Sequence, residues 1–360
     1  MKSLLPWLIP VLLVACIAYT AWRFWRILPF PPLGKSIAVA VYLLSFLLIF
    51  PHYLFGDRMP IGLARATYVI GTSWMIFFLY ALLLFLLLGA CRRLHLIPAS
   101  LLEHSTAGSA LVLGTITLLL CAGGIHFHHK HREVLDVKTE KPLEKQLTLV
   151  LASDLHAGYH IGREEIGRWA RLFNKEKPDL VLFAGDILDG SLRPVLEGHF
   201  EDVFRDIQAP VYACLGNHEY LAGRARAEAF LSDAGIHLLK DSALTVQGIR
   251  IVGRDDRSNP NRAALKDLFA ADSVFTLLLD HQPSHLEEAE AAGVDFQFSG
   301  HTHYGQVWPG NWVTRALFEK AAGAYRRGGT QYYISSGLGL WGGRFRIGTR
   351  SEYLVIHLHN

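Results

Sequence analysis

Hydrophobic residues form long uninterrupted blocks in the first third of the chain and short runs in the remainder. About 20 apolar residues are needed to cross a bilayer as a helix, and four blocks approach or reach that length: Leu4–Trp22, Ser36–Phe55, Tyr68–Ala90 and Gly108–Ile125. None of them contains Asp, Glu, Lys or Arg, which favours a membrane anchor over an ion path or proton relay. We predict an all-α transmembrane region of about four helices within residues 1–130.

From Gln146 onward, short apolar runs alternate with amphipathic segments. LTLVLASD, PDLVLFAGD and APVYACLGNHE have the pattern of buried strands, whereas REEIGRWARLFNKEK has apolar residues at helical spacing. This alternation is typical of right-handed βαβ units and a largely parallel sheet. We predict an α/β domain over residues 146–360, with two packed sheets and helices outside, joined to the anchor by a linker at residues 131–145.

Later segments complete the prediction for this domain. VLEGHFEDVFRDI and Ala225–Ala234 are helix candidates. IHLLKD, ALTVQG and IRIVGRD read as consecutive strands, the last two joined by a hairpin turn at Gly248. FTLLLDHQP, DFQFSGHTH, TQYYISSGLG and EYLVIHLH are further strand candidates.

Charge separates the two halves of the chain. Residues 1–130 hold 9 Lys and Arg against 2 Asp and Glu, whereas residues 131–360 hold 26 against 30. The second half therefore has no basic surplus, which argues against general nucleic-acid binding. The four cysteines have no C-x-x-C spacing, so neither a disulfide framework nor a zinc-thiolate site is predicted.

Basic residues beside the apolar blocks indicate how the chain is oriented in the membrane. The loops after the first and third predicted spans carry five basic residues (Arg23, Arg26, Lys35, Arg92, Arg93). The segments on the opposite side of the membrane carry three (Lys2, Arg58, Arg65). The positive-inside rule then places the large domain outside the cytoplasm, although five lysines and arginines within residues 130–145 favour the reverse. The histidine-rich run HFHHKHRE can bind metal or sense pH, but we interpret it as a polar collar beside the membrane.

Five predicted strands end in residues that can bind metal. The endings are Asp154 and His156; Asp186 and Asp189; Asn217, His218 and Glu219; His281; and His301 and His303. In open α/β folds, sites gather outside the carboxyl ends of strands. Each ending alone is more often a turn, a polar loop or a structural residue, but their joint occurrence favours a metal site. Oxygen and nitrogen ligands without thiolate suit Mn, Fe or Zn.

These motifs resemble those of the calcineurin-like metallophosphoesterase superfamily. The matching stretches are D-L-H at 154–156, G-D-I-L-D at 185–189, G-N-H-E at 216–219, His281 and G-H-T-H at 300–303. L-D-H-Q-P, G-H-T-H-Y-G-Q and S-S-G-L-G-L-W-G-G-R-F-R-I-G are similar to a branch of membrane-tethered bacterial metallophosphoesterases. That branch includes transmembrane proteins with a metallophosphoesterase domain and is similar to UDP-2,3-diacylglucosamine pyrophosphatases of lipid A biosynthesis. The resemblance implies a four-layer αββα sandwich, and Tyr304 stands where many relatives have glycine.

The resemblance also implies roles for individual residues. One metal would take Asp154, His156, Asp186 and His303, and the second would take Asp186, Asn217, His281 and His301. Water activated between the two cations would attack phosphorus, and His218 would protonate the leaving oxygen. Asp189 is a weaker candidate, which either orients a histidine or starts a turn. His160, Arg344 and Arg346 are weaker candidates for contact with phosphate. For the two arginines, the alternative is a solvated position on the surface.

Together these features predict a membrane-anchored hydrolase with two divalent metal ions. We expect it to act on a phosphodiester or pyrophosphate, and a lipid-linked substrate such as UDP-2,3-diacylglucosamine is our preferred hypothesis. One alternative is a nucleotide phosphodiesterase. Another, of a different class, is a membrane sensor whose metal domain is not catalytic. We expect the lipid bilayer as a partner and no nucleic acid.

Overall fold

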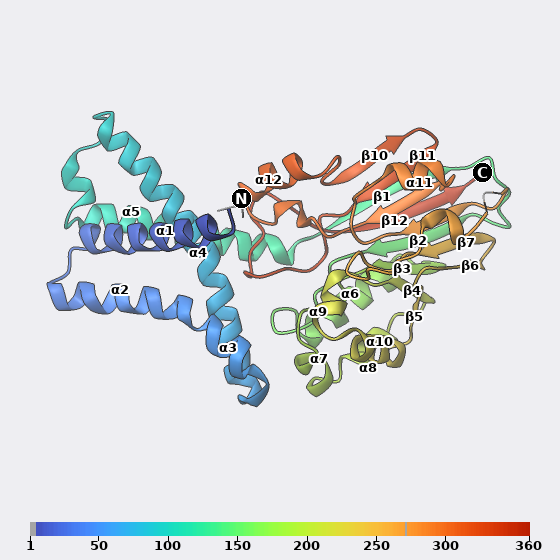
Figure 1. The fold of residues 1–360 in the computed structure, drawn as a ribbon, viewed down its shortest axis with the longest axis horizontal. Helices are drawn as coiled ribbons and strands as arrows, with labels where there is room; N and C mark the ends of the chain where they lie inside the picture. The colour runs from blue at the N-terminus through green and yellow to red at the C-terminus, as the bar shows by residue number, and fades with distance from the viewer. Residues whose placement is uncertain (1–4, 271) are drawn as a thin grey trace. The chain divides into compact units, whose positions relative to one another are not determined.

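The computed structural model describes residues 5–270 and 272–360. Leu4, where the first predicted span begins, lies outside the described residues, as does Lys2. The chain divides into two compact units, which are treated separately below: residues 1–125 with 342–345, and residues 126–341 with 346–360. Figure 1 shows the course of the chain through both.

The first unit is helical. Its helices are α1 (Leu5–Ile27), α2 (Pro32–Leu47), α3 (Ile49–Phe55), α4 (Ile61–Arg93) and α5 (Thr106–His128), with single 3₁₀ turns η1 (Gly56–Arg58) and η2 (Ala99–Leu102). Among the described residues, four helical spans are long and apolar enough to cross a membrane: Leu8–Ile27, Pro32–Arg58, Ile61–Arg93 and Thr106–His128. The predicted number of spans is confirmed.

The helices extend beyond the predicted apolar blocks. Helix α4 continues to Arg93, three residues past the apolar block, and α5 runs on through His126 to His128. Apolar composition marks the part of a helix that suits the bilayer. Polar residues at the ends continue the same backbone hydrogen bonds, so hydropathy alone places the ends too early.

The second unit contains two six-stranded sheets. Their strand orders are β1-β12-β2-β3-β4-β5 and β10-β11-β9-β8-β7-β6. The strands are β1 (Lys130–Lys138), β2 (Leu147–Ala152), β3 (Leu180–Ala184), β4 (Val211–Cys214), β5 (Ile236–Leu238), β6 (Ser242–Val246), β7 (Ile249–Gly253), β8 (Thr276–Leu279), β9 (Phe296–Ser299), β10 (Gly323–Arg327), β11 (Thr330–Ile334) and β12 (Ser351–His359). Most neighbours are parallel; β12–β2, β10–β11 and β6–β7 are antiparallel.

The second unit also contains helices, most of which cover the outer faces of the sheets. They are α6 (Arg163–Lys175), α7 (Arg193–Glu197), α8 (Phe200–Arg205), α9 (Asn217–Leu221), α10 (Arg224–Asp233), α11 (Glu287–Ala291) and α12 (Gly310–Leu317), with 3₁₀ turns η3 (Leu265–Asp267) and η4 (His303–Gly305). In Figure 1, α6 to α10 gather along the sheet that contains β2 to β5.

Side-chain alternation along β2 shows how the layers are built. Leu147, Leu149 and Leu151 are buried between the two sheets. Val150 and Ala152 point to the opposite face and pack in the cluster that includes helix α6. Successive strand residues point to opposite faces, so a strand that is apolar throughout is covered on both sides. A third cluster joins the outer face of the second sheet to α11. The predicted four-layer αββα arrangement is confirmed.

Two of the sequence predictions are wrong at the level of individual elements. Most of the predicted linker, residues 131–145, is strand β1, which pairs in parallel with β12. The strand begins with four polar residues, Lys130 to Glu133, directly after a membrane span, so the sequence pattern is that of a connection. The segment VLEGHFEDVFRDI forms two short helices, α7 and α8, because the chain turns at His199 with a φ of +48°. Strand β10 and helix α12 were not predicted.

The Gln247–Gly248 turn matches its prediction. It joins the antiparallel strands β6 and β7, and both residues have positive φ values, +53° and +78°. Positive φ at both central positions is the geometry of a type I′ hairpin turn, which glycine adopts without steric cost.

The position of β1 predicts where a soluble fragment must begin. A fragment of residues 126–360 keeps β1 together with Phe127 and Val137, which are both 1% exposed. A fragment of residues 146–360 lacks them and exposes β12. We expect the shorter fragment to be less stable by about 3 kcal/mol or more, the cost of losing a large buried side chain. Urea unfolding followed by circular dichroism would measure the difference, and equal midpoints would contradict the assignment of β1 to the domain core.

Candidate metal centre

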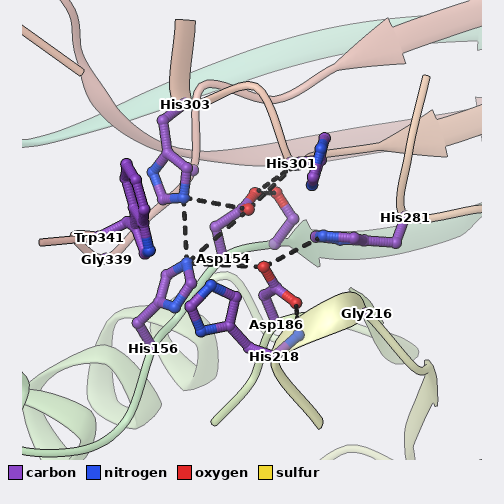
Figure 2. Close-up of polar contacts among 12 residues, drawn as sticks. Asp154, His156, Asp186, Gly216, His218, His281, His301, His303, Gly339 and Trp341 are labelled. Atoms are coloured by element: carbon purple, nitrogen blue, oxygen red, sulfur yellow. Dashed lines mark hydrogen bonds and ion pairs between the residues drawn. The ribbon is translucent and has the colours of Figure 1, made fainter. Parts of the chain in front are cut away.

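The residues that can bind metal lie where five strands end. Asp154 and His156 follow β2, Asp186 follows β3, Asn217 begins α9 after β4, His281 follows β8, and His301 and His303 follow β9. Because β2, β3 and β4 are parallel neighbours, as are β8 and β9, their carboxyl ends open toward one edge of each sheet. Figure 2 shows Asp154, His156, Asp186, His281, His301 and His303 converging.

Backbone strain is concentrated in this centre. Asp154, His156, Asp186, His301 and His303 all have positive φ values, between +46° and +69°. Residues with a side chain rarely adopt this conformation, which costs about 1–3 kcal/mol each and clusters at functional sites. Strand-like hydrogen bonds hold it in place: the Asp154 amide donates to the Gly185 carbonyl (3.1 Å) and the His156 amide to the Asp186 carbonyl (3.0 Å).

A first group of donor atoms comes from Asp154, His156 and His303. The two Nε2 atoms are 3.0 Å apart, and His303 Nε2 is 3.3 Å from Asp154 Oδ1. All three side chains are buried. Asp154 is fixed from its other side, where Ser153 Oγ donates to Oδ2 (2.6 Å) and the His301 amide donates to Oδ1 (3.0 Å). This group can surround one cation.

A second group comes from Asp186, His281, His301 and Asn217. His281 Nε2 is 3.1 Å from Asp186 Oδ2 and 3.2 Å from Asn217 Oδ1. His301 Nδ1 is 2.9 Å from the same Asn217 oxygen. The ring of His281 is oriented by its other nitrogen, which lies 2.8 Å from the Ala184 carbonyl. A backbone partner of this kind fixes which nitrogen of a histidine is left for a metal.

Asp186 connects the two groups. Its Oδ2 is 3.1 Å from His281 Nε2 and 3.8 Å from His156 Nε2. The other oxygen, Oδ1, accepts a hydrogen bond of 2.8 Å from the His218 amide. One carboxylate oxygen, Oδ2, therefore faces both groups.

The donor set fits cations. Close approach of the His156 and His303 Nε2 atoms is unfavourable if both present lone pairs to each other, and a cation between them removes the conflict. Burial lowers the pKa of His303 well below its usual range, and His156 and Arg346 lower it further, so this imidazole is neutral and has a lone pair to offer. Burial opposes ionisation of Asp186, but the facing histidines, led by His281, lower its pKa overall.

Two glycines allow the ligand loops to approach one another. A Cβ on Gly300 would lie 2.2 Å from Asp154 Oδ2, and one on Gly216 would lie 2.2 Å from Asp186 Oδ1. Neither space can hold a side chain while the carboxylate keeps its position. The glycine that precedes each motif is therefore required by packing.

Asp189 lies between two histidines beside the first group. Its Oδ1 is 3.2 Å from His218 Nδ1 and 3.8 Å from His156 Nδ1. Burial raises the pKa of Asp189, but the two histidines lower it overall. Burial lowers the pKa of His218, but Asp189 and Asp186 raise it overall. The arrangement supports the predicted orienting role for Asp189.

Glu219 was noted only as a possible ligand, and the structure gives it another function. Its carboxylate accepts hydrogen bonds from the backbone amides of Asp186 (3.1 Å), Leu188 (2.9 Å) and Gly216 (2.7 Å). Burial and the nearby Asp186 raise its pKa to about 7. Glu219 fixes the loops after β3 and β4 against each other. Its place in G-N-H-E was the only signal in the sequence.

The three weaker candidates for phosphate contact differ in their surroundings. Arg346 is fully buried and donates to the carbonyls of His303 (3.2 Å), Gly337 (3.0 Å) and Gly339 (2.8 Å). Its guanidinium holds backbone, so a positioning role replaces the predicted phosphate contact and the alternative of a solvated surface. Arg344 belongs to residues 342–345 of the first unit, and its contact with phosphate stays a prediction. His160 is buried in the loop that carries His156, and its contact with phosphate stays a prediction.

Known proteins match this chain mainly through the second unit. The family model described as calcineurin-like phosphoesterase matches residues 147–305. An uncharacterized metallophosphoesterase of Helicobacter pylori is 29% identical over 60% of this chain and 60% of its own length. This chain therefore spans about 60% of that relative.

Two animal relatives match over a longer part of the chain. A transmembrane protein with metallophosphoesterase domain from Danio rerio is 28% identical, covering 78% of this chain and 71% of that protein. A putative metallophosphoesterase of Caenorhabditis elegans is 27% identical, covering 92% and 75%. A match over 92% of the chain includes much of the helical first unit. The four candidate spans and the name of the Danio rerio relative together indicate a membrane protein.

A single methyl group tests the geometry of the metal centre. In Gly300→Ala, the new Cβ displaces Asp154 from its position, so we expect metal content per chain to fall by half or more. Gly329→Ala is a matched control, because a Cβ there has no atom within 4 Å. Elemental analysis of both purified proteins measures the effect. Full metal content in Gly300→Ala would show that Asp154 does not bind where the structure places it.

Proposed function

We propose that this chain, whose residues 147–305 form a calcineurin-like metallophosphoesterase domain, is a membrane-anchored phosphoesterase that uses two divalent metal ions. The observation that carries the proposal is the pair of donor groups that share one oxygen of Asp186. The two groups would hold two cations, which would supply water activated at neutral pH and offset the charge that develops at phosphorus.

The chain's own residues contribute orientation and proton transfer. Asp154 and Asp186 are held by backbone amides and by Ser153, so the charge that they present needs no rearrangement during the reaction. Asn217 offers a neutral amide oxygen. It leaves more positive charge in the centre than a carboxylate would, which favours a phosphate anion.

His218 is the candidate general acid. Its Nδ1 faces Asp189 at 3.2 Å, which leaves Nε2 for transfer of a proton to the departing oxygen. The Asp189 carboxylate stabilises the protonated imidazole, the form that a general acid needs at the start of the reaction. The reaction breaks the bond between phosphorus and the leaving oxygen, which receives the proton.

The donor set also bears on the choice of metal. Three carboxylate or amide side chains and four imidazoles, without thiolate, suit manganese, iron or zinc. We propose Mn, Fe or Zn in both sites.

Membrane anchoring supports a lipid-linked phosphodiester or pyrophosphate as the substrate. A domain tethered to a bilayer meets lipids at a raised effective concentration. UDP-2,3-diacylglucosamine is one such compound, and its hydrolysis would place the chain in lipid A biosynthesis. By the positive-inside rule, we propose that the catalytic domain lies outside the cytoplasm.

Two other functions would give different results in the same assay. A nucleotide phosphodiesterase would prefer cyclic or free nucleotides to lipids. The acidic balance of residues 131–360, 26 basic against 30 acidic, disfavours long polyanions but permits small nucleotides. A sensor with a non-catalytic metal domain would bind metal without turning over any of these compounds.

A substrate panel tests the proposal. We expect the full chain in detergent, supplied with Mn²⁺, to hydrolyse a chromogenic phosphodiester, and to turn over UDP-2,3-diacylglucosamine faster than lipid phosphates or cyclic nucleotides. Asp186→Ala should abolish turnover, because both donor groups lose their shared oxygen. Turnover by Asp186→Ala at the wild-type rate would refute the assignment of the site.

The role of His218 predicts a dependence on the leaving group. With an alkoxide leaving group, which requires protonation, His218→Ala should lower kcat by about 10²–10⁴-fold. With p-nitrophenolate, which departs without a proton, the loss should be much smaller. An equal loss with both substrates would assign His218 to binding or structure, and unchanged metal content is the control.

A further inference from the structure

Helix α12 exposes an apolar face. No residue of α12 is buried, although three of its residues are large and apolar. Trp312, Val313 and Leu317 are 60%, 58% and 73% exposed. At 100° per residue these three lie on one side, together with Ala316, while Asn311, Thr314 and Arg315 lie on the other. An amphipathic helix normally buries its apolar side, and here that side is open.

Two further tryptophans lie on the loop that precedes α12 and on the segment bonded to that loop. Trp308 is 41% exposed and packs edge-on against Trp312, with ring centroids 5.3 Å apart. Trp341 is 58% exposed, and its backbone is held by the Gln306 side chain through bonds of 2.7 and 2.8 Å. We call Trp308, Trp312, Val313, Leu317 and Trp341 the aromatic face.

The aromatic face is unusual within the second unit. Among the residues described from 126 onward, the exposed large apolar side chains are these five and Val134, Leu196 and Leu221. Single exposed apolar residues need no explanation, but a group that includes three tryptophans marks an interaction surface.

The loops that carry this face also carry a metal ligand. His303 is three residues before Gln306, and Arg346 bonds the His303 carbonyl as well as those of Gly337 and Gly339. The Trp308 amide donates to the Ile347 carbonyl (2.7 Å). The aromatic face is thus built on the same backbone framework as the metal centre.

The bilayer is the occupant that fits this surface. Helix α5, a candidate membrane span, ends at His128 and strand β1 begins at Lys130. One residue separates them, so the second unit follows a candidate membrane span directly in the chain. Tryptophan favours the membrane–water interface, where its ring meets acyl chains and its N–H meets headgroups. Helices that lie in this interface have an apolar face with Trp and Leu and a polar face with Arg or Lys.

We infer that the aromatic face docks on the surface of the bilayer that anchors the chain, with Trp312, Val313 and Leu317 at the boundary between headgroups and acyl chains. This docking brings the loop of His303 close to lipid headgroups. Its consequence for catalysis, that phosphoesters embedded in the membrane are preferred, rests on the proposed function.

Spin labelling of the full chain in proteoliposomes tests the docking itself. A nitroxide at Val313→Cys, with Cys16, Cys91 and Cys121 replaced, should collide more often with oxygen, which dissolves in lipid, than with a water-soluble nickel chelate. Leu196→Cys is the matched control, an exposed apolar position on α7 where the order should be reversed. Unchanged metal content would show that each labelled protein is folded.

Two results would overturn the inference. Accessibility to the nickel chelate at position 313 as high as at position 196 would show that the face lies in water. Dipolar broadening between labels at position 313 of two chains would show that a second copy covers it.

A kinetic measurement tests the consequence separately. Trp312→Ser with Leu317→Ser should raise KM for a phosphodiester lipid in vesicles by about tenfold or more, since a buried leucine contributes more than a tenfold factor. KM for a soluble phosphodiester should stay unchanged, as it should for both substrates in Leu196→Ser. An equal change with both substrates would contradict membrane docking as the cause. If wild type turned over neither substrate, the proposed function would fail while the spin-label result stood.

Discussion

The position of the Asp186 carboxylate is the constraint on which the metal centre depends. One of its oxygens faces His281 and His156, which belong to different donor groups. This placement requires a left-handed backbone at Asp186, a neighbouring glycine at 216 that leaves room for the carboxylate, and an amide of His218 that holds the second oxygen. Such a strained turn persists only because the surrounding structure fixes it on every side.

The two packed sheets supply that support. Strands β2, β3 and β8 pack against apolar residues on both faces, and all of their residues except Thr148 are buried, so their ends are fixed by packing on both sides. Glu219 and Arg346 then connect the loops: a buried carboxylate binds three amides, and a buried guanidinium binds three carbonyls. The charges of Glu219 and Arg346 are used in hydrogen bonds to backbone groups. Asp154, Asp186 and the histidines are the side chains that are available for metal binding and catalysis.

Much of this could be predicted from sequence, for a physical reason. A strand buried on both faces is a short apolar run, and its ligand follows directly, so β2 with Asp154 and β3 with Asp186 are visible as patterns. Strand β1 begins with four polar residues and has no regular alternation, so its sequence is typical of a loop. Helix α12 buries nothing within the described chain. Arg346 was expected on the surface or at phosphate, because arginine is rarely buried, and only the fold shows the carbonyls that it binds.

The central claim is that one residue, Asp186, joins two metal sites. Calorimetric titration of the metal-stripped full chain with Mn²⁺ tests it most directly. The account predicts two ions per chain for the wild type, and weakened binding of both ions in Asp186→Asn, since the lost charge faces both donor groups. A variant that lost one ion and kept the other at wild-type affinity would contradict it.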